Sequence, residues 1–132
     1  MPGETNLNTL LREMKPELNA GEYVFSLKAS INSDDLQDLI CFFREEEGTT
    51  VILPKQMADQ ANLPYTGTYS WITLTIHSSL EAVGLTAAVS QALTDANISC
   101  NIVAAYYHDH LFVPSNDTER ALDVLQKLAQ SK

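Results

Sequence analysis

The chain has 132 residues, of which 45% are hydrophobic and 19% are charged, a composition typical of a globular protein that can bury a core. Seventeen acidic against eight basic residues give a formal net charge of −9 at pH 7, which repels phosphate backbones and anionic lipid. We therefore expect no nucleic acid and no membrane as partners. The sequence shows neither a signal peptide nor an apolar run near the roughly 18 residues of a spanning helix, which predicts a cytoplasmic protein.

The first half of the chain is predicted to contain two short helices and three strands. Apolar residues at helical spacing follow a cap at Thr5 or Asn6, and Pro16 ends that helix. Strand-forming residues and a Glu-Glu-Gly break then indicate a strand followed by a hairpin. The predicted elements are a helix over 7–14, a strand over 22–28, a hairpin made by 40–45 and 49–53, and a helix over 55–61.

The second half has clearer periodicity. Residues 70–77 alternate apolar and polar side chains as a strand does, and an apolar stripe after Gly84 indicates an amphipathic helix. Residues 98–107 and 111–114 are strand-like on either side of a tight reversal, and 116–119 form a capping-box-like start for a last helix.

The order β-α-β-β-α lacks one strand of the ferredoxin-like β-α-β-β-α-β plan. That strand has to come from the first half, which shows a weaker version of the same plan. We therefore predict an α+β fold of two ferredoxin-like units with antiparallel sheets, in which strands are shared or exchanged between 1–66 and 67–132. Either 22–28 or 69–77 would complete the opposite half.

Residues 71–114, which begin WITLTIHSSLEAVGL and end DHLFVP, resemble the ACT domain family. The sequences YVF at 23–25 and FREEEGT at 43–49 are similar to the first half of small bacterial proteins made of two ACT-like units. The second half is also similar to the ACT domains of aspartate kinases and of the animal cytosolic arginine sensor. This resemblance implies an amino-acid-binding regulatory module, with a degenerate first unit at 1–66 and an ACT domain at 67–132.

The loop before the second-half helix is the candidate ligand site. A helix start leaves backbone N–H groups unpaired and carries the positive end of the helix dipole, so it can hold a carboxylate, and Gly84 allows close approach. By the resemblance, the ligand lies beside this loop at an interface between two ACT units. The alternative is that Ser79 caps a turn, Gly84 serves a bend, and the site is empty. The candidate residues are Ser78, Ser79, Val83, Gly84, Leu85 and Thr86.

His108, Asp109 and His110 form a second candidate cluster. A metal site would need three or four converging ligands, whereas two histidines around a strand turn tend to point to different places. The remaining interpretations are turn chemistry and ligand contact, because Asp109 matches an Asp-His-x-x-Val-Pro element whose Asp holds the cationic end of the ligand in the arginine sensor. Glu81 is the other acidic candidate, and neither a metal nor a cofactor is expected.

An enzyme is the weakest of three function classes. Cys41 and Cys100 lie in apolar runs typical of buried reduced thiols, with only Arg44 as a cation near Cys41 in sequence. The acidic run at 45–47 is typical of a solvated turn. We expect a non-catalytic module that binds an amino-acid-like ligand, forms a homodimer or higher assembly, and acts on another protein; the alternative is a ligand-free interaction or dimerisation module.

Overall fold

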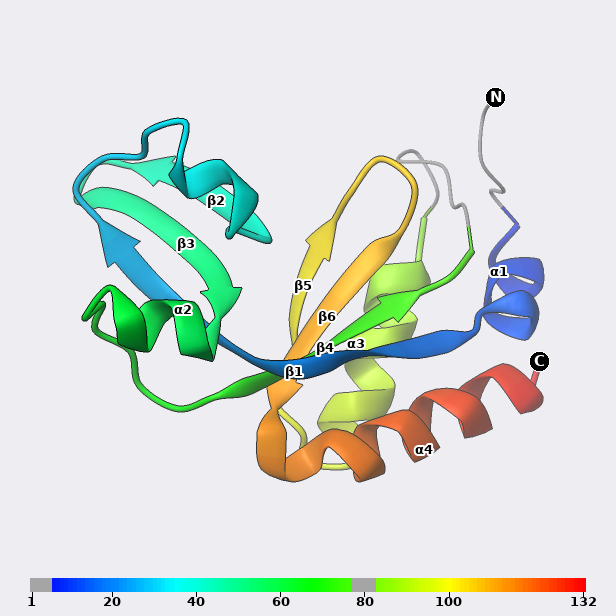
Figure 1. The fold of residues 1–132 in the computed structure, drawn as a ribbon. Coiled ribbons are helices and arrows are strands. Elements are labelled where there is room, and N and C mark those ends of the chain that lie inside the picture. The colour runs from blue at the N-terminus through cyan, green and yellow to red at the C-terminus, as the bar shows by residue number, and fades with distance from the viewer. Residues whose placement is uncertain (1–5, 77–82) are drawn as a thin grey trace. The chain divides into compact units, whose positions relative to one another are not determined.

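The structure, a computed structural model, describes residues 6–76 and 83–132. By their contacts the residues divide into a large unit, Met1–Ala20 with Ser70–Lys132, and a small unit, Gly21–Tyr69. Figure 1 labels helices α1 to α4 and strands β1 to β6, and the full set of elements follows in chain order. They are α1 (Leu7–Glu13), β1 (Pro16–Lys28), η1 (Asp35–Gln37), β2 (Cys41–Glu45), β3 (Gly48–Pro54), α2 (Lys55–Gln60), β4 (Tyr69–Leu74), α3 (Leu85–Asp95), β5 (Asn101–Ala104), β6 (Asp109–Pro114), η2 (Ser115–Asp117) and α4 (Thr118–Gln130).

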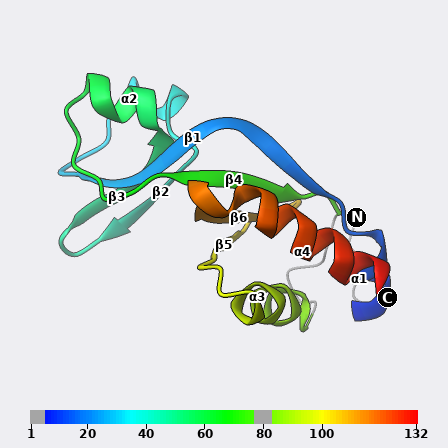
Figure 2. The same cartoon turned by 90° about the horizontal axis from the view of Figure 1, so that it is seen from below.

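The large unit is a layer of strands covered on one face by helices. Its strands follow the order β1, β4, β6, β5, and β5 pairs antiparallel with β6. Figure 2 shows α3 and α4 on the same side of these strands. The alternation predicted for β4 is observed, because its Ser70, Ile72 and Leu74 are buried while the residues between them are partly exposed. The buried core consists of Leu10, Leu11, Met14, Ile72, Leu74, Leu85, Val89, Leu93, Ile98, Leu111, Val113, Ala121 and Leu125.

The N-terminal segment belongs to this same core. Asn6 caps α1 by accepting a hydrogen bond from the Thr9 N–H at 3.0 Å, and the buried face of α1 packs against α3 and α4. The first residues of β1 then provide the strand that the second half of the sequence lacks. The predicted α+β plan with a shared strand is therefore confirmed, and β1 is the strand that both units use.

The small unit has three antiparallel strands in the order β2, β3, β1. Val24 of β1 pairs with Leu53 of β3, and Phe43 of β2 pairs with Thr50 of β3. One face holds a small buried cluster of Val24, Val51, Leu53 and Ala58. The helices of this unit are only the three-residue η1 and the six-residue α2.

The beginning of β1 and the length of β5 differ from the prediction. β1 begins at Pro16 instead of 22, although Asn and Gly at 19–21 are poor strand formers; the Asn19 Nδ2 donates to the Trp71 carbonyl at 3.2 Å and to Thr73 Oγ1 at 3.0 Å. β5 is shorter than 98–107 because the Ala105 N–H bonds to the His108 carbonyl at 3.0 Å and closes the turn early. Tertiary contacts decide these ends, and sequence periodicity does not report them.

The predicted capping box at 116–119 does not form. Residues Ser115–Asp117 make the 3-10 turn η2, and α4 begins after it without a side-chain cap from the described residues. The Thr118 hydroxyl donates to the Ser115 carbonyl at 2.8 Å. Because that donation uses the Thr118 proton, the Ser70 hydroxyl is the donor in the 2.5 Å contact between Ser70 and Thr118.

Both cysteines are free thiols, and each is half-buried instead of fully buried. Burial raises the pKa of the Cys100 thiol to about 11, so it is protonated and unreactive at neutral pH. Over the described ranges, none of the helices combines the length and the apolar character needed to span a bilayer.

Candidate functional site

Helix α3 begins directly after Gly84, as the sequence predicts. Gly84 has φ 102° and ψ −16°, and no side chain of the described residues caps the helix. Leu85 is buried in the core of the large unit, whereas Val83 and Thr86 are exposed. The first turn of α3 therefore presents backbone N–H groups and the positive end of the helix dipole close to the surface. Of the predicted site residues, Ser78, Ser79 and Glu81 lie outside the described residues.

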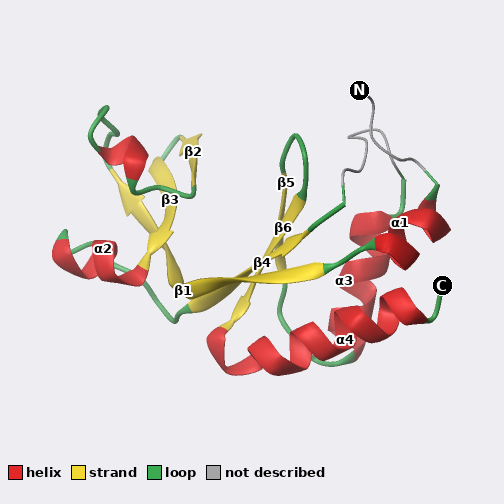
Figure 3. Ribbon diagram, turned by 45° about the vertical axis from the view of Figure 1, so that its right-hand side comes forward, coloured by secondary structure: helices red, strands yellow, loops and turns green. Residues whose placement is uncertain are grey.

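The N-terminal helix packs against this helix start. A Cβ atom placed on Gly84 would lie 3.0 Å from Leu7 Cδ2, and Figure 3 shows α1 beside the beginning of α3. Gly84 thus meets two requirements at once, a positive φ and a close approach to Leu7. Any ligand at this helix start has to use the side that Leu7 leaves uncovered.

Asp109 is the buried acidic residue of the His-Asp-His cluster. It is 8% exposed and precedes Leu111 and Val113 on the core face of β6. Among the described residues, no hydrogen-bond partner reaches its carboxylate. Burial raises the pKa of Asp109, and the neighbouring His110 and His108 oppose that rise. A buried carboxylate of this kind favours either protonation or a cation beside it.

The two histidines have separate partners. The His108 Nδ1 lies 3.3 Å from the Ile76 carbonyl, which places the start of β6 beside the end of β4. The His110 Nδ1 accepts a hydrogen bond from the Trp71 Nε1–H at 3.0 Å and lies 3.1 Å from Thr73 Oγ1. His110 is therefore neutral with its proton on Nε2. Burial is the main cause that lowers its pKa, followed by His108.

These contacts separate the members of the cluster. Asp109 lies on the core face of β6. His110 points to the other face of the sheet, where it contacts Trp71 and Thr73 of β4. The described residues contain no group of three or more ligands suited to a metal ion. Ile76 follows β4, and α3 is the next described helix in the chain. The contact of His108 with Ile76 therefore places the neighbouring Asp109 at the end of the sheet from which the chain leads to α3.

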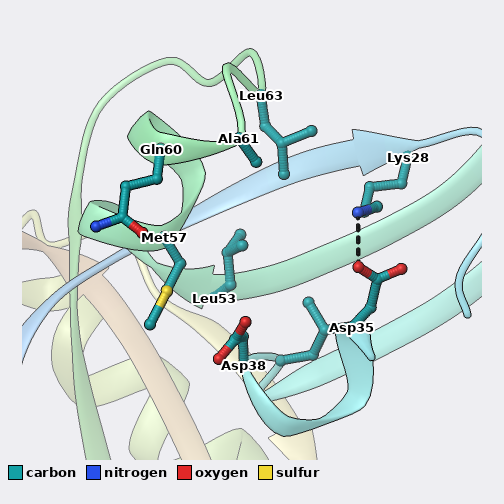
Figure 4. A pocket seen from close by; sticks show the side chains of 9 residues that line it. Lys28, Asp35, Asp38, Leu53, Met57, Gln60, Ala61 and Leu63 are labelled. Atoms are coloured by element: carbon teal, nitrogen blue, oxygen red, sulfur yellow. Dashed lines mark hydrogen bonds and ion pairs between the residues drawn. The ribbon is translucent and has the colours of Figure 1, made fainter. Parts of the chain in front are cut away.

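The small unit contains a cavity that was not predicted from the sequence. It has a volume of about 220 Å³ and lies between η1, β3 and α2 (Figure 4). Its residues are too far apart in sequence to form a motif. The sequence feature that could have predicted the cavity is the absence of a helical pattern between the strand at 22–28 and the hairpin, because without a helix there little of the sheet is covered. The cavity is lined by Lys28, Asp35, Asp38, Leu39, Leu53, Met57, Gln60, Ala61 and Leu63.

Solved structures share this fold along most of the chain. A protein of unknown function from Vibrio cholerae, described as a possible transport protein, is 47% identical with a TM-score of 0.84, over 93% of this chain and 95% of that one. A protein from Agrobacterium tumefaciens is 21% identical with a TM-score of 0.73, over 88% and 89% of the two chains. The regulatory subunit of aspartate kinase from Thermus thermophilus, in its ligand-free form, is 10% identical with a TM-score of 0.65, over 89% and 97%.

Family models agree with the structural similarity. No curated protein matches the sequence at a significant level. Two models described as ACT domain match the chain, one over residues 2–70 and the other over 67–127. The two matches overlap at residues 67–70, whereas the compact units divide the chain differently because α1 and the first residues of β1 belong to the large unit. The chain therefore belongs to the ACT domain family, with two ACT domains in tandem.

Proposed function

We propose that this protein is a non-catalytic regulatory module that binds a small amino-acid-like ligand and transmits its presence to another protein. The observation that carries the proposal is the buried carboxylate of Asp109 at the end of the sheet from which the chain leads to α3. An amino-acid zwitterion carries a group suited to each of two features of the protein. Its carboxylate suits the N-terminus of α3, and its ammonium or cationic side chain suits Asp109.

Similar regulatory proteins support the class of function. The regulatory subunits of aspartate kinase from Thermus share the fold, and an aspartokinase III from Escherichia coli with the same fold is described in complex with aspartate and ADP. Of the predicted ligand-binding residues, Gly84, Leu85 and Thr86 would hold the carboxylate by their backbone, with Val83 beside them, and Asp109 would hold the cation. In this proposal the site lies at an interface between two ACT units, and the protein is a homo-oligomer.

Thermal unfolding with each common amino acid tests the proposal, because a ligand that binds only the native state raises the melting temperature. With a ligand found in this way, Asp109→Asn should weaken binding by about 1.5–3 kcal/mol, the range for hydrogen bonds to charged groups. His108→Ala and His110→Ala serve as neighbouring controls and should change affinity far less. Added zinc or EDTA should leave binding unchanged; equal losses from all three substitutions, restored by metal, would contradict the proposal.

A ligand-free interaction module is the second candidate. The exposed apolar side chains of Leu27 and Phe43, which both pair with Thr50 in the small unit, favour it, with exposed fractions of 45% and 70%. If no amino acid raises the melting temperature while the protein still associates through this surface, the ligand-free function is the correct one.

A further inference from the structure

The small unit leaves part of its sheet uncovered. In a ferredoxin-like unit two helices cover one face of the sheet, but here the two positions are taken by a three-residue turn, η1, and a six-residue helix, α2. The buried cluster beneath them has only four residues. The cavity of about 220 Å³ occupies the space between these two short elements.

The cavity has an apolar floor and a charged wall. Leu39, Leu53, Met57 and Leu63 provide the apolar surface. Figure 4 shows the pair Lys28 and Asp35 at one side of the cavity and Met57 and Gln60 at the other. The Lys28 Nζ lies 2.9 Å from Asp35 Oδ1, and the two side chains are 23% and 20% exposed.

The charge of the lining is not balanced. Lys28 and Asp35 neutralise each other, and the Asp35 Oδ2 also accepts a hydrogen bond from the Asn32 N–H at 3.0 Å. Asp38 is the second aspartate of the lining, and within the described residues its carboxylate forms no hydrogen bond or ion pair. One lysine against two aspartates leaves one negative charge at the cavity, on Asp38.

We propose that this cavity binds a small compound with one ammonium group and a short aliphatic body. The ammonium lies at Asp38, and the aliphatic part lies on Leu53 and Met57, as ligand sites generally combine apolar walls with a few polar groups that fix orientation. The volume is below the roughly 300 Å³ at which drug-sized ligand sites begin, so the occupant has only a few carbon atoms. This site is separate from the proposed site at Gly84 and does not depend on it.

Titration with n-butylammonium chloride, followed by backbone amide NMR of the full chain, tests the proposal. Sodium butyrate and n-butanol at the same ionic strength are matched probes that keep the aliphatic chain and change the charge. The ammonium compound should shift the amides of residues 38–39, 57–61 and 63, and the two other probes should bind at least about fivefold more weakly, since only the ammonium pairs with Asp38.

Two aspartate variants separate a charge effect from a folding effect. Asp38→Asn should weaken butylammonium about five- to tenfold while the melting temperature stays near that of the wild type. Asp34→Asn is the control, because Asp34 and Asp38 are both exposed in the same part of the chain but only Asp38 belongs to the cavity lining. Equal shifts from all three probes, shifts confined to residues 83–86 and 109, or unchanged affinity in the Asp38 variant would each overturn the proposal.

Discussion

Asp109 occupies a position at which β6 would otherwise present an apolar side chain to the core, next to Leu111 and Val113. Burial raises its pKa above the ordinary value of 3.8, so the folded protein holds its proton more tightly than the unfolded chain does. The stabilisation from this group is complete at pH values below the ordinary pKa and is lost as the pH rises through the raised pKa.

We therefore predict that Asp109→Asn increases the free energy of unfolding at neutral pH in the absence of ligand, because asparagine never carries the charge. The gain should shrink as the pH falls towards about 4. Urea unfolding across this pH range measures it. Asp123→Asn is the control: Asp123 is exposed on α4 beside Lys127, so this substitution should not increase the free energy of unfolding at neutral pH. A loss of stability at neutral pH in the Asp109 variant would mean that the Asp109 carboxylate is paired.

Gly84 and Gly67 allow the effect of backbone strain to be separated from the effect of a steric contact. Both have positive φ, 102° and 77°, but a Cβ at Gly84 would meet Leu7 at 3.0 Å, whereas none of the described atoms lies within 4 Å of one at Gly67. Gly67→Ala should cost about 1–3 kcal/mol from backbone strain, and Gly84→Ala should cost more because Leu7 has to move. In a Leu7→Ala background the extra cost should disappear, as denaturant unfolding of the double variant would reveal.

At the scale of elements, polar side chains join β1, β4 and β6 on the side of the sheet opposite the main core. Asn19 donates to Thr73 Oγ1 at 3.0 Å, and both Trp71 and Thr73 approach the His110 Nδ1. The Trp71 and Phe112 rings stack with their centroids 6.2 Å apart. This arrangement requires a neutral His110, which fits the lowered pKa of that residue.

Protonation of His110 should break its hydrogen bond with Trp71. Trp71 is the one tryptophan of the sequence, so its fluorescence should change as the pH falls below the ordinary histidine value of 6.5 and through the lowered pKa of His110. The stability from neutral His110 is complete above about 6.5 and is lost over the same fall in pH.

Replacing His108 tests in which direction this residue shifts the pKa of His110. The positive charge of His108 contributes to the lowered pKa of His110, so His108→Asn should move the fluorescence midpoint to higher pH. His110→Gln should abolish the transition. A transition that survives in the His110 variant would assign the titration to another group.

Elements with strong periodicity were predictable, and those fixed by distant contacts were not. β4 and α3 follow from alternation and from an apolar stripe after Gly84. The beginning of β1 depends on Asn19 bonding to β4, which lies 52 residues later in the chain at Trp71. The same distinction applies to the sites: Gly84 and Asp109 stand in recognisable local patterns, whereas the cavity joins residues from Lys28 to Leu63.

The two units of the duplicated fold differ in the size of their cores and in the length of their helices. The large unit buries a continuous core under α1, α3 and α4, while the small unit has a buried cluster of four apolar residues and short helices. Since stabilisation grows with the apolar area removed from water, the small unit gains less from its own core. Contacts with a second copy of the chain would supply further burial.

The outer face of the small unit is suited to such a contact. Leu27 and Phe43 both pair with Thr50, on either side of it, and remain 45% and 70% exposed. β2 is also an edge strand, and edge strands with exposed apolar side chains are surfaces for association. A closed dimer would cover this face of both copies at once.

We predict that the wild-type chain is a homodimer or larger at micromolar concentration and that Phe43→Ser weakens the assembly about tenfold or more, because aromatic residues near the centre of an interface contribute most to binding. Tyr106→Ser is the control, since Tyr106 is also exposed but lies in the turn between β5 and β6 of the large unit. Light scattering over a dilution series measures both. A monomeric wild type, or an equal effect of the two substitutions, would show that this face does not mediate association, and the exposed Phe43 would then need a different partner.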